Sequence, residues 1–296
     1  MTILSVALEA KAGLGECPRW HKAERRLYWV DIERCELHRF DPTTGHDEYV
    51  QFDEPVGCFA FIEGGGGLML GMKNGFARLD AWGAAPIPFG EQIFTDNPDL
   101  RLNDGRTDAR GRFWAGSVNM AKSAHDAALY RLDGDGSVHW IEGGMLTCNG
   151  AAFDEGDRHF YHADTPTHML RRYDVDGYSG ELSNPKVFHR FPMGEGRPDG
   201  GSVDADGCYW SALFDGGRVV RLSPDGEIIG SIVLPVSRPT MIAFGGTDRC
   251  TAYVTTARKG LSSTQLLEQP LAGSLFSFPV QVPGLAEHCF AISSQS

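Results

Sequence analysis

Four oxygen-bearing side chains occupy equivalent positions along the sequence. Each lies 10 to 12 residues before the first aromatic residue of a strand-like segment, and the pairs are Glu16 and Tyr28, Asn103 and Phe113, Asn149 and Phe160, and Asp199 and Tyr209. Glycine or proline flanks each of the four, so the backbone there can approach a ligand closely or is held rigidly. Carboxylates and amide carbonyls form an all-oxygen donor set, which suits a hard or borderline divalent cation completed by water. Such an ion could polarise a carbonyl group or activate water for ester hydrolysis.

Each of these residues also has an ordinary structural interpretation. Taken alone, Glu16 could be a surface turn residue. Asn149 and Asp199 each precede a glycine, which is typical of turns. Asn103 and Asp104 could simply cap a turn through side-chain hydrogen bonds to the backbone. The shared position in a repeat is what favours the ligand interpretation.

Other metal and nucleophile chemistry has less support in the sequence. The ten histidines form no H-x-x-x-H or H-E-x-x-H pattern, and the seven cysteines are scattered singly without a C-x-x-C pair. Cys148 adjoins Asn149, but no histidine is positioned beside it in the sequence. We therefore expect Cys148 to be a buried apolar residue rather than a nucleophile.

A strand-like core recurs six times and implies an architecture that would bring the four polar side chains together. The cores are LYWVDI (27–32), GLMLGM (67–72), RFWAGS (112–117), HFYHAD (159–164), CYWSAL (208–213) and TAYVTT (251–256). Their starts lie 40 to 49 residues apart, which is the spacing of four-stranded propeller blades. Turns rich in Asp and Gly precede several cores, as tight hairpins require.

We therefore expect an all-β fold, a six-bladed β-propeller with four-stranded antiparallel blades, forming a single domain over residues 1–296. The last blade is one strand short, so the N-terminal segment TILSVALEA (2–10) is expected to close the ring as its outer strand. Residues at one register would then converge at one rim of the central channel. The second and sixth blades offer little charge at that register, so the predicted site faces one side of the channel.

Charge and composition narrow the class of partner. The 27 Lys and Arg residues against 39 Asp and Glu give a net charge of −12, without any block of basic residues. This balance argues against a nucleic acid or an anionic membrane as a partner. The N-terminal segment lacks a secretory signal pattern, and no apolar run approaches the ~18 residues of a membrane span. We expect a cytoplasmic monomer that acts on a small molecule.

Four motifs in order resemble those of a known family. They are G-E-C-P-x-W at 15–20, R-x-N-D-G at 101–105, C-N-G at 148–150 and R-P-D-G at 197–200. Together they are similar to the signature motifs of the SMP-30/gluconolactonase/regucalcin family of six-bladed propellers. Within that family the sequence most resembles bacterial sugar lactonases such as xylonolactonases.

The resemblance implies roles for individual residues. It implies one divalent metal ion held by Glu16, Asn149 and Asp199, with Asp199 also acting as the general base. It implies a substrate pocket lined by Arg101, Asn103 and Asp104. Relatives carry acidic residues after the third-blade strand, whereas this sequence reads AGSVNMAK there. We expect Asn119 to contact the substrate in their place.

The expected function is metal-dependent hydrolysis of a sugar lactone, such as xylonolactone or gluconolactone, to the aldonic acid. The donor set leaves Fe²⁺, Mn²⁺, Mg²⁺, Zn²⁺ and Ca²⁺ open as the native ion. The alternative is a non-catalytic, calcium-binding or protein-binding propeller, since a fold does not fix function.

Overall fold

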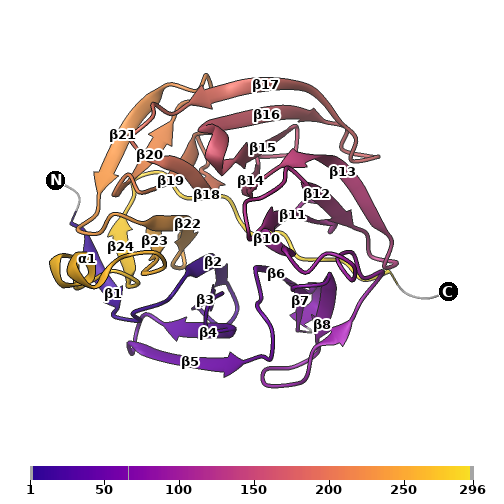
Figure 1. Ribbon diagram of the computed structural model, residues 1–296, viewed down its shortest axis with the longest axis horizontal. Helices are drawn as coiled ribbons and strands as arrows, with labels where there is room; N and C mark the ends of the chain where they lie inside the picture. Colours follow the sequence, from indigo (N-terminus) through magenta and orange to yellow (C-terminus); the bar gives the residue numbers. More distant parts are fainter. Residues whose placement is uncertain (1–2, 66, 294–296) are drawn as a thin grey trace.

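The computed structural model describes residues 3–65 and 67–293, which form a ring of six four-stranded antiparallel sheets (Figure 1). The first blade contains β2 (Gly15–His21), β3 (Arg26–Asp31), β4 (Glu36–Asp41) and β5 (His46–Gln51). The second contains β6 (Cys58–Phe61), β7 (Leu68–Gly71), β8 (Phe76–Leu79) and β9 (Ile87–Pro88), with a 3₁₀ turn, η1 (Glu63–Gly65), between β6 and β7. The third contains β10 (Leu100–Thr107), β11 (Phe113–Asn119), β12 (Ala127–Leu132) and β13 (Val138–Met145).

The second half of the ring repeats this plan. The fourth blade contains β14 (Cys148–Phe153), β15 (His159–Asp164), β16 (Met169–Val175) and β17 (Leu182–Arg190), with η2 (Thr165–Thr167) after β15. The fifth contains β18 (Arg197–Val203), β19 (Tyr209–Phe214), β20 (Arg218–Leu222) and β21 (Ile228–Val233). The sixth contains β22 (Pro239–Gly245), β23 (Thr251–Thr256), β24 (Leu275–Pro279) and β1 (Ser5–Leu8). The expected propeller architecture is confirmed.

The ring closes as the sequence predicts. β1 pairs antiparallel with β24, with Ser5 opposite Ser277 and Val6 opposite Phe276. The N-terminal strand thus covers the outer edge of a blade whose other three strands come from the C-terminal part of the chain. An uncovered edge would expose unpaired backbone groups, so this pairing protects the last blade as well as closing the circle.

The recurring cores form the second strand of each blade, not the innermost one. The innermost strands β2, β6, β10, β14, β18 and β22 surround the centre of the ring, whereas β5, β13, β17 and β21 lie at its periphery (Figure 1). The second strands are recognisable as a repeat in the sequence because they are buried between neighbouring blades and are therefore the most continuously apolar. The polar residues found 10 to 12 positions upstream therefore lie on the innermost strands themselves.

Aromatic side chains of the second strands pack the blades against one another. Trp114 of β11 contacts Phe153 and Phe160 of the fourth blade, with ring centroids 5.8 and 5.5 Å apart. Its indole Nε1 donates to the Asp108 carboxylate at 2.9 Å. Trp210 repeats this contact with Asp204 at 2.8 Å. The aspartate of each turn thus fixes both the hairpin and the buried tryptophan.

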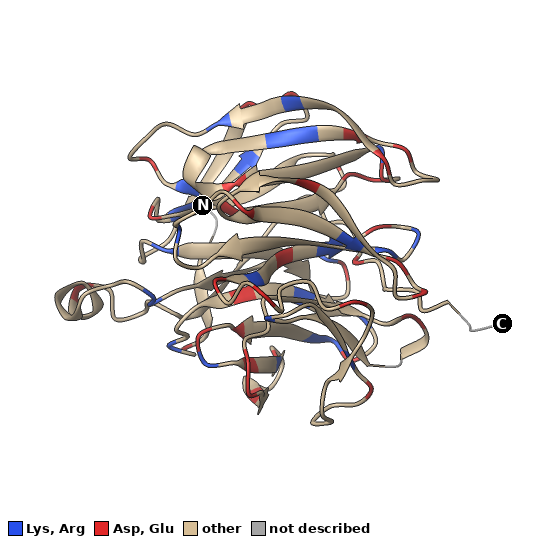
Figure 2. Ribbon diagram, turned by 45° about the vertical axis from the view of Figure 1, so that its right-hand side comes forward, with Lys and Arg blue, Asp and Glu red and all other residues tan. Residues whose placement is uncertain are grey.

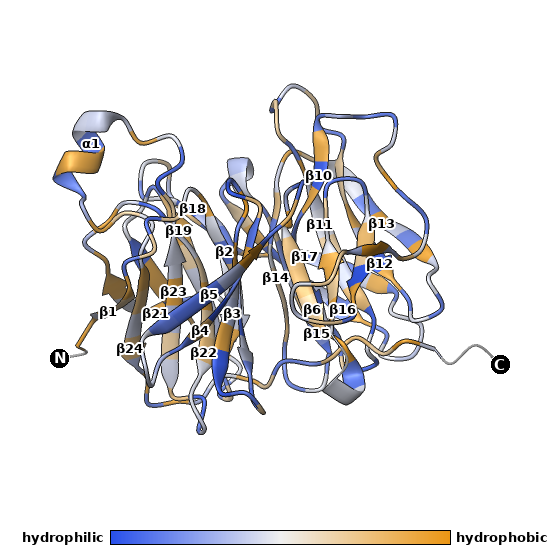
Figure 3. Ribbon diagram, turned by 90° about the horizontal axis from the view of Figure 1, so that it is seen from below, coloured by the Kyte–Doolittle hydropathy of each residue, from blue (hydrophilic) through white to orange (hydrophobic). Residues whose placement is uncertain are grey.

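A short α-helix stands apart from the strands. Helix α1 (Ser263–Glu268) begins with a capping box, in which Ser262 and Gln265 exchange side-chain to backbone hydrogen bonds. Figure 3 shows it projecting from one side of the ring, in the long connection between β23 and β24. Within residues 3–65 and 67–293, no helix has the length and apolar character needed to cross a membrane.

The C-terminal segment (283–293) crosses one end of the central channel. Its backbone bonds to the far ends of two innermost strands, Leu285 to Val203 at 3.1 Å and Phe290 to Phe61 at 2.7 Å. We call this the lower end of the channel. The upper end is the one at which β2, β10, β14 and β18 begin. Acidic and basic residues are distributed over all the blades and their connecting loops (Figure 2).

Candidate functional site in the central channel

An irregular register marks the innermost strands that carry the predicted site residues. The pairing shifts between Glu16 and Arg19 in β2, between Leu102 and Gly105 in β10, between Asn149 and Ala152 in β14, and between Pro198 and Gly201 in β18. Each shift is a β-bulge, which re-aims the side chains beside it. Glu16, Asn103, Asn149 and Asp199 all lie at or next to such a bulge, near the upper end.

Local backbone requirements explain the residues around these bulges. Gly150 has a φ of 68° and lies so close to Tyr209 that an added Cβ would be 2.6 Å from its hydroxyl oxygen. Glycine is the residue that tolerates both conditions. The Tyr209 hydroxyl in turn donates to the Gly150 carbonyl at 2.8 Å. The fourth and fifth blades are thereby locked together beside Asn149.

Two buried carboxylates come from the first and fifth blades, on either side of the sixth. Glu16 and Asp199 are only 8% and 5% exposed. Burial and the negative charges of Asp199 and Asp104 raise the pKa of Glu16 well above its usual value. Burial, followed by the charge of Asp104, likewise raises the pKa of Asp199. Arg101 lowers the pKa of Glu16 and Arg197 that of Asp199, but the net change in both is upward.

A chain of hydrogen bonds fixes the amide of Asn149. Its Oδ1 accepts from Asn103 Nδ2 at 2.8 Å, and its Nδ2 donates to Thr165 Oγ1 at 2.8 Å. The Thr165 hydroxyl in turn donates a hydrogen bond to the Pro198 carbonyl at 2.8 Å. This network determines which side of the amide carries the oxygen, and it connects three blades. Thr165 was not predicted, because its position at the start of η2, directly after β15, carries no local sequence signal for this contact.

Arg101 and Asp104 lie in the same strand as Asn103 but differ in their contacts. Arg101 Nη1 donates to the Asn103 Oδ1 and to the Leu102 carbonyl, both at 2.8 Å. The Asp104 carboxylate accepts from the backbone N–H groups of Gly105 and Ala151, both at 2.8 Å. Asp104 therefore joins the third and fourth blades, and its charge acts on Glu16 and Asp199 from that position.

Asn119 uses its amide to hold the loop between β11 and β12. Its Nδ2 donates to Asp126 Oδ1 at 2.8 Å, and its Oδ1 accepts from the Ser123 backbone at 3.3 Å. The same loop contains Lys122, whose Nζ donates to Thr147 Oγ1 in the segment leading to β14. The structure thus brings Lys122, which the sequence did not single out, to the upper end of the channel.

A second charged group occupies the lower half of the channel. Arg106 of β10 donates to the Ala151 carbonyl at 3.2 Å and to the Gly201 carbonyl at 2.7 Å, so it joins three innermost strands. Glu287 of the C-terminal segment pairs with Arg106 at 2.5 Å and with Arg19 at 3.6 Å. Burial alone would raise the pKa of Glu287, but these two cations outweigh it and lower that pKa.

The upper-end residues fit a divalent cation with oxygen ligands. Within the described chain, no three His, Cys, Asp or Glu side chains are grouped to hold a metal. The predicted ligand set has a different composition, because it combines the carboxylates of Glu16 and Asp199 with the amide oxygen of Asn149. A third carboxylate nearby, that of Asp104, accepts hydrogen bonds from backbone N–H groups instead. Buried like charges are costly unless a cation lies near them. The repulsion between Glu16 and Asp199 would be relieved by such an ion.

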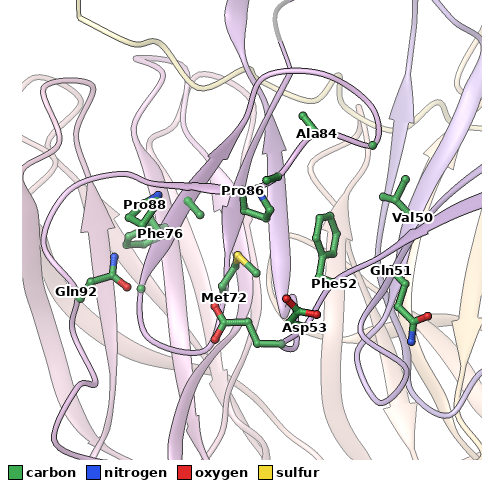
Figure 4. Close-up of a pocket in the computed structure, with 15 residues that line it drawn as sticks. Val50, Gln51, Phe52, Asp53, Met72, Phe76, Ala84, Pro86, Pro88 and Gln92 are labelled. Carbon is green, nitrogen blue, oxygen red and sulfur yellow. The ribbon is translucent and has the colours of Figure 1, made fainter.

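The channel is distinct from a pocket at the side of the ring. That pocket, of about 640 Å³, lies between the first and second blades (Figure 4), and it is lined by Phe52, Asp53, Met72, Phe76, Pro88 and Gln92, among others. It contains none of the predicted site residues. Cys148 beside Asn149 is fully buried, and burial raises the pKa of its thiol, as expected for a packing residue rather than a nucleophile.

Fold and site together define a six-bladed propeller with a polar, oxygen-rich ligand site at one end of its channel. Residues 14–258 match the family described as SMP-30/Gluconolactonase/LRE-like region, and the chain belongs to this family. A 6-deoxy-6-sulfogluconolactonase of Pseudomonas putida is 43% identical over 94% of this chain and 95% of its own. The pentonolactonase XacC of Haloferax volcanii is 36% identical, covering 97% of each chain. The crystal structure of a calcium-binding regucalcin from Agrobacterium tumefaciens superimposes with a TM-score of 0.93, at 25% identity over 98% of this chain and 97% of its own.

Proposed function

We propose that this protein is a metal-dependent hydrolase that opens a sugar lactone to give the free aldonic acid. The observation that carries the proposal is the pair of buried carboxylates, Glu16 and Asp199, held beside the fixed amides of Asn103 and Asn149. The names of two relatives, a sulfogluconolactonase and a pentonolactonase, support a lactone as the substrate. The expected partner is therefore a small molecule rather than a macromolecule.

Glu16, Asn149 and Asp199 would hold the divalent ion. When bound, the ion supplies Lewis acidity to the lactone carbonyl and offsets the negative charge that develops on its oxygen. The similar regucalcin of Agrobacterium tumefaciens is a calcium-binding protein, which supports a divalent ion without fixing its identity here. Thr165 acts through Asn149, because it orients the amide oxygen.

In this proposal Asp199 acts as the general base. Burial and the charge of Asp104 raise the pKa of Asp199, which makes its carboxylate a stronger proton acceptor. The Asp199 carboxylate would orient a water molecule and take its proton as the water oxygen bonds to the carbonyl carbon. The ring C–O bond then breaks, and the released oxygen takes up a proton to become a hydroxyl group. Arg101 and Asn103 would hold the hydroxyl groups of the sugar.

The test compares chelated protein with protein reloaded separately with Ca²⁺, Mn²⁺, Mg²⁺, Zn²⁺ or Fe²⁺. Acid release from gluconolactone, xylonolactone and 6-deoxy-6-sulfogluconolactone is followed above the spontaneous rate. We expect release in at least one reloaded sample and its loss after chelation. Equal rates in chelated and reloaded samples would overturn metal dependence. Ion binding in a thermal shift assay without any acid release would favour the non-catalytic alternative.

A further inference from the structure

Basic side chains at the upper end of the channel differ in whether an acidic partner neutralises them. Arg197 and Arg238 both pair with Asp215, and Lys259 pairs with Glu33. Among the described residues, Arg101 and Lys122 instead bond to neutral groups. Arg101 donates to a carbonyl and to the Asn103 amide, and Lys122 donates to the Thr147 hydroxyl. Among the described residues neither Arg101 nor Lys122 therefore forms an ion pair, although Glu16 and Asp199 lie near enough for their charges to act on them.

The fold holds Lys122 in a defined position. Its backbone has a φ of 54°, and its N–H donates to the Asn119 carbonyl at 3.1 Å. The Asn119 amide then ties the loop together through Asp126 and Ser123. The Lys122 side chain reaches from the third blade to Thr147, two residues before Asn149. Lys122 is an exposed residue, but these contacts hold its loop and its ammonium group in a defined position.

The surroundings of Lys122 are unfavourable for an isolated cation. Burial and the positive charges of Arg101 and Lys259 lower its pKa to about 8, against the opposing effect of Asp164 and Asp199. The carboxylates around this loop are engaged elsewhere, because Asp126 Oδ1 accepts from Asn119 Nδ2 at 2.8 Å and Asp164 Oδ1 accepts from the Leu146 and Thr147 backbones at 3.2 and 2.9 Å. At neutral pH most molecules still carry the Lys122 proton. An incoming anion would be stabilised there and would in turn stabilise the cation.

We propose that Lys122, with Arg101 beside it, binds an anionic substituent carried by the lactone at the end of the sugar away from the carbonyl group. The inference rests on the proposed lactonase function and names the substrate class of that site. A sulfonate and a phosphate ester share the required chemistry, since both present charged oxygens to an ammonium group. A neutral lactone needs no such cation, and a protein with a net charge of −12 would otherwise repel an anionic substrate.

The test measures kcat/KM for gluconolactone, 6-deoxy-6-sulfogluconolactone and 6-phosphogluconolactone in the full-length, metal-loaded protein. We expect Lys122→Gln to lower the ratio of anionic to neutral kcat/KM about 10- to 100-fold. Lys122→Arg should restore most of that ratio, and Lys122→Glu should lower it further. The control is Lys186→Gln on the exposed outer strand β17, which should leave the ratio unchanged. The sulfonate and phosphate ratios, compared with each other, identify the preferred anion.

Thr147→Val separates charge recognition from loop anchoring, because it removes the hydroxyl partner but leaves the cation. We expect it to change the ratio less than Lys122→Gln does. A readout other than turnover is calorimetric binding of the sulfonated aldonate product, which should weaken in Lys122→Gln and with added salt in the wild type.

The outcomes distinguish the two proposals. If neutral lactone is hydrolysed but Lys122→Gln and Lys186→Gln give equal ratios, the anion subsite is wrong and the lactonase function stands. Equal losses on neutral and anionic substrates in Lys122→Gln would also overturn the subsite, since Lys122 would then only hold the loop. If no lactone is hydrolysed with any ion, the proposed function itself fails.

Discussion

Glu287→Gln offers a direct test of how the C-terminal segment is held against the ring. The wild-type carboxylate pairs with Arg106 at 2.5 Å and with Arg19 at 3.6 Å, and its side chain is only 16% exposed. At an effective dielectric constant of about 20, the longer pair alone corresponds to about 4–5 kcal/mol of Coulomb attraction, before the cost of desolvation. Glutamine keeps the size of the side chain but removes the negative charge that pairs with both arginines.

We expect this variant to lose about 3 kcal/mol of unfolding free energy, the lower end of the range for breaking a buried ion pair. For a chain of 296 residues, with an unfolding entropy of about 2 cal/mol/K per residue, this corresponds to a Tm lower by about 5 °C. The assay is thermal unfolding followed by circular dichroism at pH 7. The control is Glu155→Gln, an exposed residue in a loop at the same lower end.

The pH dependence supplies a second readout for the same pair. The pKa of Glu287 is lowered in the folded protein, so its stabilisation is present above the usual carboxyl pKa of 4.5 and is lost as the pH falls through the lowered value. The wild type should therefore lose more stability than Glu287→Gln on acidification below about pH 4.5. A Tm decrease under 1 °C at pH 7, or equal decreases in Glu287→Gln and Glu155→Gln, would refute this account of the lower end.

Three further predictions concern the upper end and the core. Asp199→Asn should lower kcat at least 100-fold and reduce stabilisation by divalent ions, yet the chelated variant should unfold no earlier than wild type, because repulsion with Glu16 is relieved. Thr165→Val should weaken divalent-ion binding about 10-fold in calorimetry, with recovery in Thr165→Ser. Burial lowers the pKa of His162 to about 3, so unfolded chains take up a proton below pH 6.5 that folded ones do not. Urea unfolding should thus show stability falling between pH 6.5 and 4.5, and less steeply in His162→Leu.

The sequence contains most of the information that determines the fold. Each blade is a local unit with its own apolar core and its own Asp-Gly turns, so the repeat alone indicates six blades. The shortage of one strand in the last blade predicts the pairing of β1 with β24, although about 270 residues separate them. Long-range pairing is predictable here because the last blade alone lacks a fourth strand in its own segment of the sequence.

The site is predictable only in part from the sequence. Glu16, Asn149 and Asp199 share a register that follows from the repeat, but the bulges that re-aim them depend on how each strand pairs with its neighbour. Thr165 and Lys122 lie on connecting loops of other strands, and nothing near them in the sequence indicates their contacts. The two hydrogen bonds that the Asn119 side-chain amide forms within its own loop were likewise not predicted. The contact of Asn119 with substrate stays a prediction.

The pairing of β1 with β24 also constrains how the protein is made. Of the strands in this propeller, β1 is synthesised first, yet it finds its partner only when residues 275–279 have been made, so the nascent propeller must carry an unpaired strand until its last blade is synthesised. Contacts between residues this far apart in the chain close slowly. Blades one to five can form in order as they emerge, whereas the sixth is completed by a return to the beginning. Fusion of a bulky partner directly before Ser5 would hinder that last step more than it would disturb the finished ring.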